Sequence, residues 1–266
     1  MTTARASLVL APNPSPMTLD GTNTWVLLEP GGTQAAVVDP GPLDEAHLSA
    51  VLRHTEQSGA RVSVILLTHG HPDHAESARR FAELTGAPVR ALDPALRLGS
   101  EGLADGDVVT LGGLEIRVLG TPGHTADSLS FLVSADGALL TGDTVLGRGS
   151  TLVAHPDGRL ADYLASLESL RGLAERGEAT VVLPGHGGVL DQPLAAIDHY
   201  LAHRRTRLAQ VEAALAAGDR TAAEVVRRVY ADVDPVLWPA AELNVLAQLE
   251  YLRDGGSRPD RAGEPG

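Results

Sequence analysis

Three histidines and one aspartate crowd into a single short segment, Thr68 to His74, and no other part of the 266-residue chain restricts the fold as strongly. The preceding residues, 62–67, are apolar and rich in β-branched side chains, which predicts a buried strand. Pro72 stops the strand ladder and favours a helix start, so we expect a helix over residues 73–84 that ends at Gly86. The polar side chains therefore lie on a strand-to-helix turn, where they can converge.

The spacing of these side chains indicates a metal site. His69 and His71 are two residues apart and can share one ion, whereas Asp73 and His74 point elsewhere and would need a second ion. Imidazole and carboxylate groups are ligands that suit zinc. The alternative is a polar turn without chemistry, which the strand leading into it makes the weaker interpretation. The spacing thus predicts a dinuclear site.

Three later residues lie in similar places. His124 sits in a glycine-proline turn, Asp143 follows the apolar run 138–140, and His186 follows the apolar run 180–182. Taken alone, each has an ordinary role, as a turn residue or a helix cap. Taken together with the first four, they complete a set of seven candidate metal ligands: His69, His71, Asp73, His74, His124, Asp143 and His186.

This order of residues, His-x-His-x-Asp-His followed by His, Asp and His on separate loops, resembles the metallo-β-lactamase superfamily over roughly residues 8–198. The resemblance implies an α/β fold, a four-layer αββα sandwich with the metals at one edge. It implies two Zn²⁺ ions per chain. The first would be held by His69, His71 and His124 and the second by Asp73, His74 and His186, with Asp143 bridging the two.

The implied activity is hydrolysis. Zinc lowers the pKa of its bound water to about 7, so a metal-bridging hydroxide can attack a carbonyl carbon or a phosphorus at neutral pH. We expect Asp73 to orient that hydroxide. Asp39, at the end of the apolar run 36–38, has two interpretations. It either supports the metal site from behind the ligands, as in the family, or initiates an Asp-Pro-Gly turn.

The C-terminal part looks like a separate element. We expect one helix over residues 193–217, a second from a capping box at Thr221 through Val229, and a third over 239–252. Four leucines form one stripe of the third helix, namely Leu243, Leu246, Leu249 and Leu252. The predicted organisation is a hydrolase domain at 1–198, a helical appendage at 199–254 and a disordered tail at 255–266.

Three helices after such a core resemble the winged-helix appendage of the lactamase-beta-2-like branch, whose mitochondrial members are single-stranded RNA endonucleases. The segments 13–24 and 244–249 resemble that branch as well. This resemblance favours a single-stranded RNA substrate, with phosphates contacted by Arg204, Arg205 and Arg207. The other interpretation of this arginine cluster is a solvated helix face paired with acidic residues. Thr22 and Asn23 are further candidate substrate contacts.

The charge balance favours a different substrate. Nine arginines and ten acidic residues follow residue 198, so residues 1–198 carry −12 of the net charge of −13. An acidic core fits a small ester or thioester better than a nucleic acid, as in a thioesterase, lactonase or glyoxalase II-like enzyme. The branch resemblance gives RNA a slight precedence. A diiron oxidoreductase is a remote third class, because that branch usually has Glu at the position of His71.

Cysteine is absent from the chain, which excludes disulfides and thiolate ligands. Because lactamases often carry Cys at the position of Asp143, its absence argues mildly against an antibiotic-hydrolysing enzyme. The first twenty residues contain one apolar run, residues 8–11, which is too short for a signal peptide or a membrane span. We therefore expect a cytoplasmic protein without a membrane partner. No motif specifies an oligomeric state.

Overall fold

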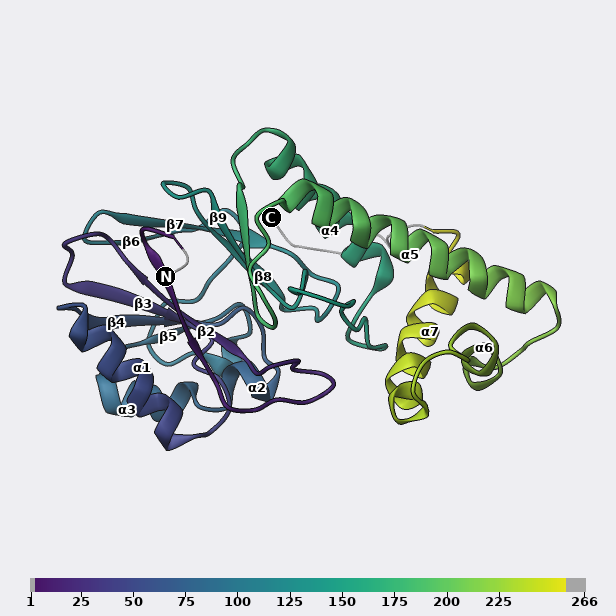
Figure 1. The fold of residues 1–266 in the computed structure, drawn as a ribbon, viewed down its shortest axis with the longest axis horizontal. Coiled ribbons are helices and arrows are strands. Elements are labelled where there is room, and N and C mark those ends of the chain that lie inside the picture. Colours follow the sequence, from purple (N-terminus) through teal and green to yellow (C-terminus); the bar gives the residue numbers. More distant parts are fainter. Residues whose placement is uncertain (1–2, 257–266) are drawn as a thin grey trace.

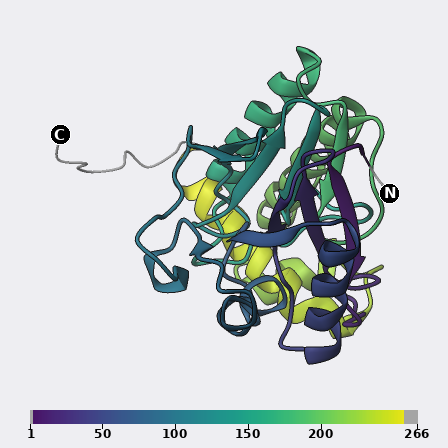
Figure 2. The same cartoon turned by 90° about the vertical axis from the view of Figure 1, so that its left-hand side faces the viewer.

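In the computed structural model, which describes residues 3–256, two five-stranded sheets pack face to face between outer helices (Figures 1 and 2). The first sheet has the order β1-β2-β3-β4-β5 and the second the order β10-β9-β8-β7-β6. The strands of the first sheet are β1 Ala6–Leu10, β2 Asn23–Leu28, β3 Gln34–Val38, β4 Arg61–Leu66 and β5 Val89–Arg90. Those of the second are β6 Val108–Leu111, β7 Leu114–Gly120, β8 Leu129–Val133, β9 Ala138–Gly142 and β10 Val181–Pro184.

Buried side chains on both faces of the strands explain the four layers. In β3 and β4, Val38 and Leu66 face the second sheet, while the neighbouring Val37 and Ile65 face the outer helices, as the two-residue period of a strand requires. Helices α1 Glu45–Gln57 and α3 Ala78–Thr85 cover the first sheet, and α4 Leu160–Glu175 and α5 Pro193–Ala216 cover the second. The expected αββα sandwich is confirmed.

The helix expected at 73–84 is divided in two. A short helix, α2 Pro72–Ala75, ends before Ser77, and α3 begins at Ala78. The break is stabilised by Ser77, which is fully buried and donates both its backbone N–H and its hydroxyl to the carbonyl oxygen of Gly41. A side chain that bonds a carbonyl outside the helix competes with the helical pattern. Gly86 ends α3 in the left-handed conformation, as predicted.

The C-terminal helices pack against the second half of α5 and extend to one side of the sandwich (Figure 1). The long helix α5 runs without interruption through residue 198, where the sequence suggested a domain boundary. After it come α6 Ala222–Val229, a short 3₁₀ helix Pro235–Leu237 and α7 Trp238–Arg253. The capping box at Thr221 is present, and Val225 and Val245 form part of a small core with α5.

The leucine stripe of α7 is only partly packed. Leu243 and Leu246 are 39% and 38% exposed, whereas Asn244, Val245 and Gln248 face the interior. The reason is that α7 lies in the angle between α4, α5 and α6, so its contact face is set by three helices and not by its most apolar stripe. The predicted disordered tail falls mostly on residues 257–266, which lie outside the described residues. None of the helices in residues 3–256 combines the length and apolar character needed to span a membrane.

Candidate metal centre and the adjoining pocket

The seven candidate ligands come together at one edge of the sandwich. They lie in the loops or short helix that follow strands β4, β7, β9 and β10, so both sheets contribute. Within the described residues, their ligand atoms form three groups in which all atoms lie within 4.8 Å of one another. These groups are His69, His71 and His124; His69, His74 and Asp143; and Asp73, His74 and His186.

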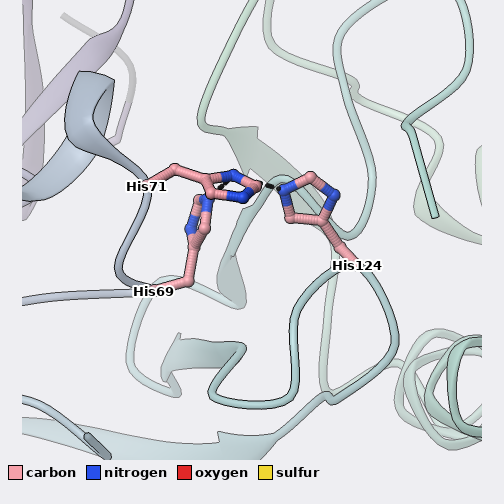
Figure 3. A group of neighbouring side chains, drawn as sticks. All are labelled: His69, His71 and His124. Atoms are coloured by element: carbon pink, nitrogen blue, oxygen red, sulfur yellow. Dashed lines mark hydrogen bonds between the residues drawn. The ribbon is translucent and has the colours of Figure 1, made fainter. Parts of the chain in front are cut away.

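The first group is a convergence of three imidazole rings (Figure 3). The Nδ1 atom of His71 lies 3.0 Å from His69 Nε2 and 3.0 Å from His124 Nε2. The Nδ1 atom of His124 lies 2.6 Å from the carbonyl oxygen of Leu152, which requires a proton on Nδ1 and leaves the Nε2 lone pair facing the cluster. Three imidazole nitrogens are thus presented to one point, as zinc requires.

The second group has the same construction. His74 Nε2 and His186 Nε2 are 3.1 Å apart, and His186 Nε2 is 3.1 Å from a carboxylate oxygen of Asp73. On the opposite sides of the rings, His74 Nδ1 lies 2.8 Å from Asp39 and His186 Nδ1 lies 3.1 Å from the carbonyl oxygen of Gly21. Each of these acceptors holds a ring in the orientation in which Nε2 is free to bind a cation.

Asp143 lies between the two groups. Its Oδ1 is 3.3 Å from His74 Nε2 and 3.4 Å from His186 Nε2, and its Oδ2 is 3.7 Å from His124 Nε2. Oδ1 is buried and has no hydrogen-bond partner within residues 3–256. A buried carboxylate oxygen without a partner is unfavourable unless a cation neutralises it. The donor set therefore fits a dinuclear metal site, in which Asp143 can reach both ions.

Charge and backbone geometry keep this carboxylate in place. Burial alone would raise the pKa of Asp143, but His74 and His186 outweigh it and hold that pKa well below its ordinary value. A side chain at Gly185 would place its Cβ 2.6 Å from Asp143 Oδ1 and 2.8 Å from His74, so only glycine permits this approach. The glycine of the Pro-Gly-His turn is thus required by the ligand cluster itself.

Asp39 supports the cluster from behind. One oxygen accepts the backbone N–H of Thr68 at 2.8 Å, and the other accepts the Thr68 hydroxyl at 2.6 Å and lies 2.8 Å from His74 Nδ1. Asp39 has a φ of 51°, a backbone conformation that is uncommon for residues other than glycine. The end of β3 is therefore tied to both the His69 turn and His74, and the same residue also occupies the tight turn.

We expected Thr22 and Asn23 to contact substrate, but in the structure they support the loop that carries His186. Both are buried. Thr22 pairs with His186 in a β-bridge, and the side-chain amide of Asn23 donates to the carbonyl oxygens of Pro184 and Gly187, each at 2.9 Å. These bonds hold the loop that carries His186. The two residues lie behind the metal ligands because their segment joins the two sheets.

The three arginines do not form one basic surface, because neighbouring positions on a helix point in different directions. Arg204 is 1% exposed, donates to the Thr151 carbonyl oxygen and to Asn244 Oδ1, and lies 4.8 Å from the centre of the Tyr163 ring. Arg205 is exposed and pairs with Glu168. Arg204 is therefore an interior residue and is not available to a phosphate in solvent.

Arg207 is neither fully buried like Arg204 nor exposed and paired like Arg205. It is half-buried, and its guanidinium lies 4.7 Å from the centre of the Tyr230 ring. It lines a cavity of about 310 Å³ between the sandwich and the C-terminal helices. His124 and Asp143 line the same cavity, so it is continuous with the metal cluster. Most of its remaining walls are apolar and include Pro16, Met17, Leu19, Leu146, Leu152, Val233, Leu237, Ala240 and Ala241.

Sequence reasoning missed these pocket residues. Met17 and Leu19 belong to the N-terminal loop, Leu152 follows β9, and Leu237 and Ala241 belong to the C-terminal helices. Isolated apolar residues in loops carry no periodic signal, and only the proximity of three distant segments makes them neighbours. A second cavity, of about 530 Å³, lies beside His71 and carries three carboxyl groups: Asp93, Asp127 and Asp157.

The family model for the metallo-beta-lactamase superfamily matches residues 17–186, which include all seven candidate ligands. The chain belongs to the metallo-beta-lactamase superfamily. Its members are generally hydrolytic metalloenzymes, and this protein is accordingly a metal-dependent hydrolase. A second model, the beta-lactamase associated winged helix domain, matches residues 221–256. The expected branch with its C-terminal appendage is thereby confirmed.

Individual relatives cover most of the chain. It is 33% identical to a beta-lactamase-like protein 2 homolog from Drosophila melanogaster, over 93% of this chain and 87% of the relative. It is 31% identical to an atrochrysone carboxyl ACP thioesterase from Aspergillus fumigatus, over 85% and 73%. A metallo-beta-lactamase family protein from Thermus thermophilus has a similar structure, with a TM-score of 0.78, 28% identity and 94% of both chains covered.

Proposed function

We propose that this superfamily member is a dinuclear zinc hydrolase that cleaves small thioesters or esters with an apolar acyl group. The observation that carries the proposal is the apolar cavity that opens onto His124 and Asp143. A pocket with mostly apolar walls and a few polar groups at one end is typical of a site for a small organic ligand. The thioesterase among the relatives supports the same substrate class.

In this proposal His69, His71 and His124 would hold one zinc ion, Asp73, His74 and His186 would hold the other, and Asp143 would serve both. When bound, the two ions supply an acidified water and a Lewis acid for the carbonyl oxygen. Asp73 is the more exposed of the two ligating carboxylates, with 28% of its side chain accessible against 11% for Asp143, so it is the one that would orient the attacking hydroxide. The pocket holds the acyl group and keeps water away from it.

Single-stranded RNA is the second candidate, and the winged-helix match at residues 221–256 favours it. Two observations argue for the thioester. Arg204 is buried, which leaves Arg205 and Arg207 of the three arginines for phosphate contacts. The three carboxyl groups in the cavity beside His71 would repel a phosphodiester backbone that passes over the metals.

One experiment separates these candidates. Zinc-loaded protein is incubated side by side with the N-acetylcysteamine thioester of octanoic acid and with a short single-stranded RNA, each with and without a chelator. We expect chelator-sensitive release of the thiol and no cleavage of the RNA. Cleavage of the RNA alone would overturn the proposal. In that case, RNA affinity should fall with salt by a slope of about −0.7 per phosphate contact, and Arg205→Ala should flatten the slope.

Metal analysis tests the choice of metal in the same preparation. Protein purified without chelator should contain two zinc ions per chain. Two iron ions, together with redox activity, would instead support the diiron class. One ion or none would contradict the dinuclear assignment.

A further inference from the structure

The pocket has two chemically different ends. At the first end, Leu152 accepts the hydrogen bond from His124, and the next residue, Val153, donates its N–H to Asn244 at 3.3 Å. From Asn244, α7 runs back along the cavity to its first residue, Trp238, next to Leu237, a distance of about 10 Å at 1.5 Å per residue. The second end is formed by Leu237, Arg207 and Tyr230, which line the cavity and include no metal ligand. Tyr230 also connects it to the first end, because its hydroxyl accepts a hydrogen bond from Asn244 Nδ2 at 3.4 Å.

Arg207 is the unusual group at this far end. Its Nη1 donates to the carbonyl oxygen of Val229 at 2.9 Å and to Gln210 at 3.1 Å, and its guanidinium stacks on Tyr230. These contacts fix the plane of the guanidinium. Within the described part of the chain it pairs with no carboxylate, although the protein has 34 acidic and 21 basic residues. A fixed, half-buried cation without a counter-ion is a ready partner for an anion.

The other basic side chains that line the pocket, Arg148 and His203, are not available to bind an anion as Arg207 is. Arg148 also lines the cavity, but both of its terminal nitrogens are bound to Asp20. His203, one helical turn before Arg207, lines the cavity too. Burial, with Arg204 and Arg207 nearby, lowers the pKa of His203 to about 4, so this ring is neutral at pH 7. This end of the cavity therefore carries one positive charge that has no carboxylate partner among residues 3–256, in the same cavity as the metal ligands His124 and Asp143.

We infer that the pocket recognises an acyl group that ends in a carboxylate, and that Arg207 determines this specificity by binding the carboxylate. The preferred substrate is then the half-thioester of an aliphatic dicarboxylic acid, with its thioester at the metal cluster and its methylene chain along α7. The inference rests on the proposed thioester hydrolysis and adds the chemistry of the distal end. Bidentate pairing between a guanidinium and a carboxylate gives both the affinity and the orientation.

The test compares two thioesters that differ only at the distal end, the octanoyl and the octanedioyl thioester of N-acetylcysteamine. The intact zinc-loaded protein should hydrolyse the octanedioyl compound with a kcat/KM at least about tenfold higher, the usual effect of a hydrogen bond to a charged group. Arg207→Met should remove this preference, and Arg207→Lys should keep part of it. Arg227→Met is the matched control, because Arg227 is an exposed arginine of the same helical unit that does not line the pocket. It should behave like the unmodified protein.

A binding measurement tests the role of Arg207 without requiring that the protein hydrolyse the thioester. Calorimetric titration of octanedioate into the zinc-loaded protein should give a lower Kd than octanoate, and Arg207→Met should abolish the difference. Unchanged zinc content and circular dichroism of the variant confirm that it is folded, and Arg207→Gln is the second variant if it is not. Hydrolysis of both thioesters at equal rates would overturn the inference and leave the proposed function intact. If neither thioester is hydrolysed, the proposed function is overturned, and the titration still shows whether Arg207 binds the distal carboxylate.

Discussion

The metal cluster and the adjoining pocket are neighbours built in opposite ways. The cluster is polar and buried, and acceptors on the outer side of the rings hold His74, His124 and His186 in place. The pocket is mostly apolar and has two arginines, of which Arg148 is paired with Asp20 and Arg207 has no carboxylate partner among the described residues. The cluster depends on short loops that directly follow strands, whereas the pocket depends on how distant segments pack. In the proposed function, reaction chemistry and substrate choice therefore reside in different residues, and we expect that they can be changed separately.

The largest expected effect comes from removing Asp143, the residue proposed to serve both ions. Asp143→Ala should lower zinc content at both positions and depress thioester hydrolysis by at least about a thousandfold, as expected for a member of a catalytic unit. His186→Ala, the matched variant, should mainly empty the second position. Zinc per chain and kcat/KM are measured for both variants. Full occupancy in Asp143→Ala would show that the carboxylate is not a bridge.

A smaller effect should separate two neighbouring arginines. Arg204→Ala removes the buried guanidinium that donates to Asn244 and to the Thr151 carbonyl oxygen, so the free energy of unfolding should fall by about 3 kcal/mol. Arg205→Ala removes only an exposed ion pair with Glu168, so the free energy of unfolding should change by less than about 0.5 kcal/mol. Urea titration measures both. Equal losses would mean that Arg204 is not the link between the α7 helix and the loop beside the metal cluster.

The smallest effect concerns pH and the pocket alone. Because the folded-state pKa of His203 is lowered to about 4, the unfolded chain binds more protons at this residue between pH 6.5 and 4. Its contribution to stability should therefore decrease as the pH falls through that range. His203→Gln lacks this dependence, so the free energy of unfolding of the unmodified protein, relative to the variant, should be lower at pH 5 than at pH 7. If the difference in free energy of unfolding between the two proteins is the same at both pH values, the pKa of His203 is not lowered by burial.

The secondary structure was largely predictable where local patterns were strong. The strand before His69, the Gly86 terminator and the capping box at Thr221 all follow from residues within one or two turns of each other. The break at Ser77 was not predictable, because it depends on the carbonyl oxygen of Gly41, far away in the sequence. Arg204 was predictable as a buried residue. It lies three and four residues after Leu201 and Tyr200, on the buried stripe of α5.

The sequence alone determined the composition of the metal cluster, because each candidate ligand follows a strand or turn that can be recognised locally, and strand ends meet at one edge of the sandwich. It did not determine what lies beside that cluster. Met17, Leu237 and Arg207 belong to three segments whose meeting depends on the docking of the C-terminal helices against the sandwich. Only tertiary packing decides which of three arginines, close together on one helix, is buried, which is paired at the surface and which faces the pocket. The physical reason is that a helix turns by a fixed angle per residue, while the surfaces around it come from distant parts of the chain.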